Sequence, residues 1–257
     1  MLDTDMNMML FSFIMMRMAG CILMNPVFGR TNIPISVKSG MIFTFTLLVY
    51  SVSGPMEIEV DGNAIGYAVL LLKEFAAGYV LGAVFNFFLS AILYAGAVID
   101  YQMGLSMSTI YDAQSNSSIS MTSNLLNMIF IICFLTTDAH LTLLRIFLSS
   151  ADIVPYGTIT LGPEAAAAAL AMFSQFMSLI LRLAMPMLAV QLFVEVGVGI
   201  LMKTIPQINI FVINIQAKIL IGLVIFLILF FPMADFLLSL VNTLIQSMSD
   251  LLGSMRG

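Results

Sequence analysis

Residues 65–99 read IGYAVLLLKEFAAGYVLGAVFNFFLSAILYAGAVI, an apolar run in which only Lys73 and Glu74 carry charge. A helix that crosses a bilayer needs about 20 residues, so this run is too long for one perpendicular crossing. It also contains Gly78-x-x-x-Gly82, a spacing that lets two membrane helices approach closely. We therefore predict a membrane helix whose glycine face packs on a neighbouring helix.

The composition of the whole chain agrees with a membrane protein. Of its 257 residues, 61% are hydrophobic and only 9% are charged, whereas a soluble domain is about a quarter charged. The net charge of -5 argues against nucleic-acid binding, which needs a clustered basic face. One histidine, His140, and two widely separated cysteines leave too few ligands for a metal site. No catalytic or cofactor-binding motif is present, so we predict a protein that is not an enzyme and has no cofactor.

Six apolar blocks follow one another along the chain and predict an all-α membrane fold. They cover about residues 6–24, 41–52, 65–99, 125–148, 165–202 and 219–245. The loops that carry Arg30 and Lys38, or Lys203 and Lys218, alternate with acidic loops. Because basic loops stay in the cytoplasm, this alternation predicts six crossings with both chain ends outside the cytoplasm.

Several charged residues lie inside the apolar blocks, where they are expensive unless they face protein or a cavity. We expect interhelical polar contacts from Lys73, Glu74, Asp138, Arg145, Arg182 and Glu195. Lys73 and Glu74 point about 100° apart on a helix and should find separate partners. Asp138 and Arg145 are seven residues apart and should share a face; interhelical contact is favoured there, and a proton relay is the alternative. Gly197-x-Gly199 also predicts close helix packing.

Short motifs in a fixed order carry a resemblance to a known family. They are 26–34 (PVFGRTNIP) with 37–40 (VKSG), 104–112 (GLSMSTIYD), Asp138-Ala-His140 with Leu143-Leu-Arg145, Ala184-Met-Pro186, and 206–211 (PQINIF) with Lys218. Together they cover almost the whole chain. The set resembles the FliR family of the bacterial flagellar type III export gate.

The resemblance implies a structural role in protein export and no enzymatic reaction. FliR proteins form and seal part of the pore through which unfolded flagellar proteins leave the cell, in the inner membrane at the flagellar basal body. The expected partners are FliP-like and FliQ-like subunits, in a 5:4:1 ratio with FliR, and FlhB-like and FlhA-like components. The implied fold is a FliP-like part over residues 1–171 fused to a FliQ-like part over 172–257, with bent helical hairpins in place of straight spans.

The resemblance also implies a plug in the closed pore at about residues 104–121, and we expect Met107, Ile110 and Tyr111 to form the seal. This segment is rich in Ser, Thr and Asn. Non-helical backbone of this kind cannot be satisfied by lipid, so it must be buried in protein, line a cavity or reach water. An ordinary solvated loop is the alternative.

Three other functions compete with a flagellar gate subunit. The equivalent subunit of a virulence injectisome would share the architecture. A small-molecule or ion transporter would show inverted repeats with paired broken helices, and the two halves of this sequence lack such symmetry. A membrane protease would need more than the scattered carboxylates found here.

Overall fold

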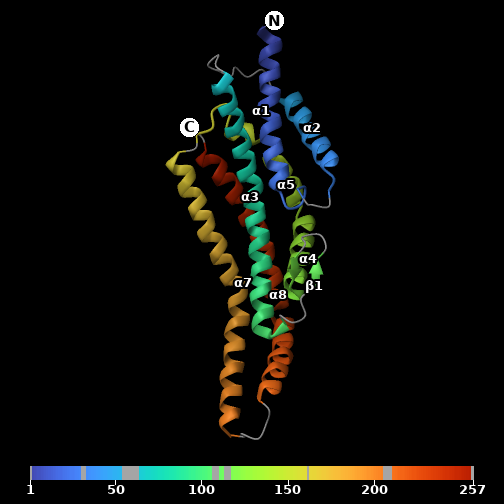
Figure 1. Cartoon of the computed structure of the whole chain (residues 1–257), viewed down its shortest axis with the longest axis vertical. Helices are drawn as coiled ribbons and strands as arrows, with labels where there is room; N and C mark the ends of the chain where they lie inside the picture. Colours follow the sequence, from blue (N-terminus) through green and yellow to red (C-terminus); the bar gives the residue numbers. More distant parts are fainter. Residues whose placement is uncertain are drawn as a thin grey trace. The chain divides into compact units, whose positions relative to one another are not determined.

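A computed structural model describes residues 2–29, 33–53, 64–105, 110–112, 117–160, 162–204 and 210–255, and the prediction of an all-α chain is confirmed over these ranges (Figure 1). The exceptions are two three-residue strands between α3 and α4. The elements are α1 (Leu2–Met24), α2 (Ile35–Val52), α3 (Ala64–Met103), β1 (Ile110–Asp112), β2 (Ser117–Ile119), α4 (Met121–Thr136), α5 (Ala139–Leu148), α6 (Ser150–Ile153), α7 (Pro163–Thr204) and α8 (Ile210–Ser254).

Three helices are much longer than a simple span. α3 has 40 residues, α7 has 42 and α8 has 45. α7 and α8 continue through Pro186 and Pro232, although proline removes a backbone donor from the helix interior. By length and hydropathy, α2, α3, α7 and α8 can each cross a membrane.

The prediction of six crossings is not met in the described residues. Four helices qualify as spans, or five if α4 and α5 together make one bent span. The apolar part of α1, Met8–Met24, is shorter than a full crossing. The sequence pattern predicted apolar blocks, and block length alone did not show where each helix begins, ends or bends.

The fourth predicted block is broken in the structure. α4 and α5 meet at an angle of 70°, and Asp138 between them has a φ of 54°. Left-handed backbone of this kind is uncommon outside glycine and ends a right-handed helix. The Thr136 and Thr137 hydroxyls donate to the Cys133 carbonyl, at 3.1 and 2.8 Å, and so satisfy an acceptor in the last turn of α4.

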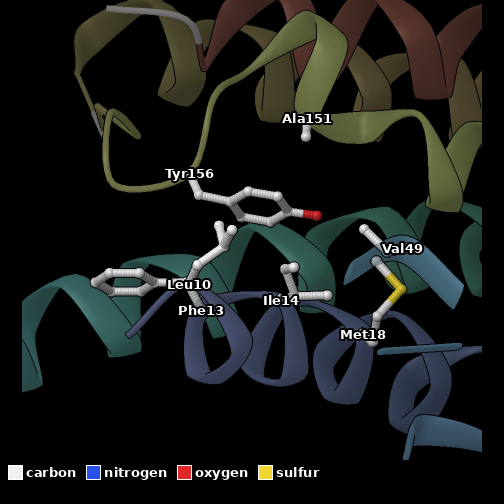
Figure 2. Packing of buried hydrophobic residues seen from close by; sticks show 7 residues of the cluster. All are labelled: Leu10, Phe13, Ile14, Met18, Val49, Ala151 and Tyr156. Carbon is white, nitrogen blue, oxygen red and sulfur yellow. The ribbon is translucent and has the colours of Figure 1, made fainter. Parts of the chain in front are cut away.

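Contacts divide the chain into two units, and the first comprises residues 1–88, 138–174 and 242–257. Its core lies where α1 packs on α2, α6 and the segment after α6. The buried cluster is formed by Leu10, Phe13, Ile14, Met18, Val49, Ala151 and Tyr156. Figure 2 shows the Tyr156 ring lying across the α1 side chains of this cluster. This core holds the segment that follows α6 against the first helix.

Within the first unit, α1 and α3 touch through glycines. A Cβ atom on Gly78 would lie 2.0 Å from the Arg17 carbonyl oxygen, and one on Gly20 would lie 2.4 Å from the Phe75 carbonyl oxygen. One turn further along α3, a Cβ atom on Gly82 would lie 3.0 Å from the Cys21 carbonyl oxygen of α1. The predicted close packing at Gly78-x-x-x-Gly82 is confirmed, because any larger side chain would push the two backbones apart.

The second unit comprises residues 89–137 and 175–241. In it, α7 and α8 are joined by a hydrogen bond from the Gln191 amide nitrogen to the Lys218 carbonyl, at 3.1 Å. The Lys218 ammonium also pairs with the Glu195 carboxylate. No atom of the described residues lies within 4 Å of the Cβ positions of Gly197 and Gly199, so the predicted packing at Gly197-x-Gly199 is not found in the part of the chain that the structure describes.

Candidate functional site

A buried ion pair joins α1 to α3 in the first unit. The Arg17 Nε atom donates to Glu74 Oε2 at 2.7 Å, and both residues are fully buried. Glu74 Oε1 accepts a second hydrogen bond from the Gly157 N–H, also at 2.7 Å. Lys73 is half-buried and makes no ion pair with a described residue. Both carboxylate oxygens of Glu74 are therefore paired, as a buried charge requires.

Arg17 also binds the segment that follows α5. Its Nη1 atom donates to the Val154 carbonyl at 2.9 Å and lies 3.4 Å from Ser150 Oγ. Its Cζ atom sits 4.3 Å from the centroid of the Tyr156 ring, a cation–π distance. Burial raises the pKa of the Tyr156 phenol to about 12, so the ring remains neutral. One guanidinium thus connects three parts of the chain that are distant in sequence.

A second buried carboxyl group lies at the end of α3 in the second unit. Asp100 is 1% exposed. Its Oδ2 atom accepts a hydrogen bond from the Thr122 N–H at 3.0 Å, and its Oδ1 atom accepts one from the Thr122 hydroxyl. Thr122 is the second residue of α4. Asp100 therefore joins the two helices that flank the predicted plug segment.

Inside that segment, β1 and β2 form a short antiparallel ladder. Ile110 lies opposite Ile119, and Tyr111 lies opposite Ser118. Of the three residues expected to form the seal, Ile110 and Tyr111 belong to β1, and Met107 lies outside the described residues. The described part of the segment therefore contains two short antiparallel strands.

The other charged residues from the sequence occupy separate places. Arg145 and Arg182 are exposed, on α5 and α7. Glu195 is about half exposed and pairs with Lys218. Asp138 precedes the first residue of α5 in left-handed backbone, so the expectation that it shares a helix face with Arg145 is wrong. Spacing of seven residues implies a shared face only along an unbroken helix.

Of the residues in the two buried clusters, sequence reasoning named Glu74 and missed Arg17 and Asp100. Arg17 was visible only as an interruption of the first apolar block, and Asp100 only as an isolated carboxylate. The signal was present in each case, since a charged residue inside an apolar run needs a polar partner. The sequence did not indicate which distant residue would supply that partner.

The described residues contain no group of three His, Cys, Asp or Glu side chains that could hold a metal ion. Cys21 and Cys133 are buried, free thiols. The arrangement of the buried polar groups ties helices and loop segments together.

Comparison with known proteins agrees with this picture of a scaffold. Residues 8–244 match the family described as "Bacterial export proteins, family 1". The chain belongs to this family. Relatives of this bacterial export protein include the flagellar biosynthetic protein FliR of Escherichia coli (strain K12), which is 25% identical over 96% of this chain and 94% of the relative. The FliR protein of Pectobacterium carotovorum is 30% identical over 77% of this chain and 75% of the relative.

A third relative of this export protein comes from another system. It is the Yop proteins translocation protein T of Yersinia pestis, which is 26% identical over 81% of this chain and 80% of the relative. The resemblance to the FliR family is thereby confirmed. The export protein is a non-enzymatic subunit of a type III export gate. Its apolar helices and its similarity to FliR proteins together support a location in the inner membrane.

Proposed function

We propose that this chain is the FliR-type subunit of the flagellar export gate, at the basal body, where it forms and seals part of the pore for unfolded flagellar proteins. The observation that carries the proposal is the family match over residues 8–244. Flagellar relatives support the flagellar system, and one of them aligns over 96% of this chain. The relative in the Yop system makes an injectisome subunit the alternative.

Deletion of the gene in its own bacterium separates these two systems. We expect the deletion strain to lose swimming and to stop releasing hook and filament proteins into the medium, because a gate without one pore subunit does not assemble. Expression of the chain from a plasmid should restore both. Export is measured by mass spectrometry of the culture supernatant. Normal flagellar export together with loss of injected effector proteins would instead assign the chain to an injectisome.

The proposed gate is a hetero-oligomer of FliP-like, FliQ-like and FliR subunits in a 5:4:1 ratio, in contact with FlhB-like and FlhA-like components. In this chain the FliP-like part covers residues 1–171 and the FliQ-like part covers 172–257. The boundary falls within α7, which is one unbroken helix. Six hydrophobic segments would then form bent hairpins, with α4 and α5 as a pair already bent by 70°.

Exposed apolar side chains on α7 and α8 support an assembly of this kind. They are Leu192, Phe193, Val196, Ile200, Leu201, Leu220, Leu223, Leu227, Ile228 and Phe231. Such surface is stable only against lipid or partner subunits.

Purification of the tagged chain from native membranes, with mass spectrometry of the bound proteins, should recover FliP-like and FliQ-like subunits in excess over the chain. Recovery of the chain alone would favour a transporter.

The plug proposal makes a separate prediction for the hairpin between α3 and α4. We expect the double substitution Ile110→Ala with Tyr111→Ala to make the membrane leaky to small solutes, because two bulky side chains of the seal are removed. Leakage is measured as entry of a membrane-impermeant dye into cells, divided by the amount of complex recovered through the tag.

The matched control for this double variant is Ile132→Ala with Tyr101→Ala, which removes the same side chains from exposed positions on α4 and α3. In cells with this control variant, dye entry per recovered complex should stay at the wild-type level. Unchanged leakage in an assembled, export-competent Ile110→Ala/Tyr111→Ala complex would contradict the plug.

A further inference from the structure

A groove runs between α1 and α2 in the first unit, where these two helices pack side by side (Figure 1). Its volume is about 550 Å³, which lies within the range of small-molecule pockets, roughly 300–1,000 Å³. Most of its surface is apolar, with Met15 and Met16 contributed by α1 and Ile42 and Phe43 by α2. The groove is therefore suited to an apolar occupant.

Small residues give this groove its depth. Ala19 of α1 and Gly40 of α2 both line it, and among the described residues nothing lies within 4 Å of the Cβ position of Gly40. The hydroxyl of Ser39, another lining residue, donates to the Ser36 carbonyl of its own helix at 2.9 Å. Methionine side chains are flexible and adapt to irregular partners. The walls can therefore follow the shape of a flexible hydrocarbon chain.

The two ends of the groove differ in chemistry. At one end Phe43 packs edge-on against Phe11 of α1, with ring centroids 6.1 Å apart. At the other end Lys38, near the start of α2, donates to the Gly29 carbonyl in the segment after α1, at 2.8 Å. An ammonium group carries three donors, and this bond uses one of them. A positive charge thus lies at one end of an apolar groove.

The outer surface of α2 is suited to lipid. The helix has 18 residues, about 27 Å at 1.5 Å per residue, which is close to the roughly 30 Å of a bilayer core. Only 11% of these residues are buried, and Ile35, Leu47, Leu48 and Val52 are exposed. When α2 crosses the bilayer, Lys38 near its first turn lies at the level of the lipid phosphate groups.

We propose that the groove between α1 and α2 binds a phospholipid with a negatively charged head group. One acyl chain lies in the groove against Met15, Met16 and Phe43, where it replaces open space with close contact. The head group lies at the opposite end from Phe43, where its phosphate binds the Lys38 ammonium. Charge complementarity at Lys38 selects an anionic lipid over a zwitterionic one. The proposal is independent of the role of the chain in the pore.

The test uses the tagged chain purified from native membranes together with its bound partners. The protein is reconstituted into phosphatidylcholine vesicles that contain a small fraction of phosphatidylglycerol with a photoactivatable acyl chain. A parallel sample contains photoactivatable phosphatidylcholine in its place. After illumination, mass spectrometry identifies the labelled peptides, and labelling is expressed per recovered chain. The comparison of the two lipids needs only the wild-type protein, so it does not depend on the folding of a variant.

Two variants and two matched controls complete the experiment. Lys38→Gln removes the charge, and Gly40→Leu places a side chain in the groove. Lys203→Gln removes an exposed lysine from the end of α7. Gly197→Leu adds the same side chain at an exposed glycine of α7, where no described atom lies within 4 Å of the Cβ position.

We expect phosphatidylglycerol to label the peptides that contain Met15 and Phe43. Labelling should be about fivefold lower with phosphatidylcholine and in Lys38→Gln, the scale set by attraction between one lysine and an anionic lipid surface. Gly40→Leu should lower labelling by both lipids, and the two controls should match the wild type.

Two results would overturn the proposal. Equal labelling of the wild-type groove by both lipids would show that Lys38 does not select the head group. Absence of label from these peptides with either lipid would show that a partner subunit, and not a lipid, covers the groove.

Discussion

Substitution of Glu74 by alanine should prevent stable assembly of the export gate, because it leaves the Arg17 guanidinium buried without a carboxylate. Removal of one partner from a buried ion pair destabilises a protein by roughly 3–5 kcal/mol. The Gly157 N–H, which donates to the other oxygen of Glu74 at 2.7 Å, would lose its acceptor as well. We expect little tagged chain in the membrane and almost no complex, measured by quantitative immunoblotting and by recovery of the complex in detergent.

The pair of Lys218 and Glu195 offers a matched control for this prediction. The Glu195 side chain is 49% exposed, and exposed ion pairs contribute at most about 1 kcal/mol. Glu195→Ala should therefore give nearly wild-type amounts of complex. Wild-type assembly of the Glu74→Ala variant would show that Arg17 finds another acceptor, and would contradict the role assigned to this pair.

Gly78→Leu should separate α1 from α3 and have an effect of similar size. The first atom of any side chain at this position would lie 2.0 Å from the Arg17 carbonyl oxygen, which belongs to the backbone and cannot rotate away. The two helices would have to move apart along a contact that also includes Gly20 and Gly82. Overpacking in a well-packed core costs about 1–3 kcal/mol, occasionally more, and here the separation would also strain the Arg17–Glu74 pair. The measurement is the amount of complex recovered per cell.

Gly253→Leu is the matched control for Gly78→Leu. Gly253 lies in the last turns of α8, and among the described residues no other part of the chain comes within 4 Å of its Cβ position. Leucine favours a helix more than glycine by about 0.8 kcal/mol, so this variant should assemble at least as well as the wild type. Equal losses from Gly78→Leu and Gly253→Leu would contradict the close-contact explanation.

Much of the fold could be predicted from the sequence, because hydropathy and helical spacing are local properties. The run at 65–99 became α3, and its two spaced glycines became the contact with α1. The break at Asp138 was not predicted, because its φ of 54° has no strong local signal in the sequence. The six predicted spans are not confirmed for a related reason, since a bend divides an apolar block without changing its composition, and four or five spans are found in the described residues.

The buried polar contacts could not be predicted from the sequence, because they join residues that are far apart along the chain. Arg17 and Glu74 are 57 residues apart, and Arg17 and Val154 are 137 apart. A single sequence shows that each charged group needs a partner. It does not show which of several candidates the fold brings near, as the exposed positions of Arg145 and Arg182 illustrate. The function was predicted from the resemblance to a family, because the sequence contains no catalytic motif from which a function could be predicted.

The contacts of Arg17 also set an order for biosynthesis. α1 is translated before α3 and carries a charge that is expensive in the bilayer until it is paired. Glu74 leaves the ribosome 57 residues later, and the Val154 carbonyl 137 residues later. The first helix therefore reaches its final environment only after a further 137 residues have been made. During synthesis, the insertion machinery must hold α1 in a polar or partly hydrated setting, and a nascent chain arrested before residue 157 would keep this helix exposed to proteases of the membrane.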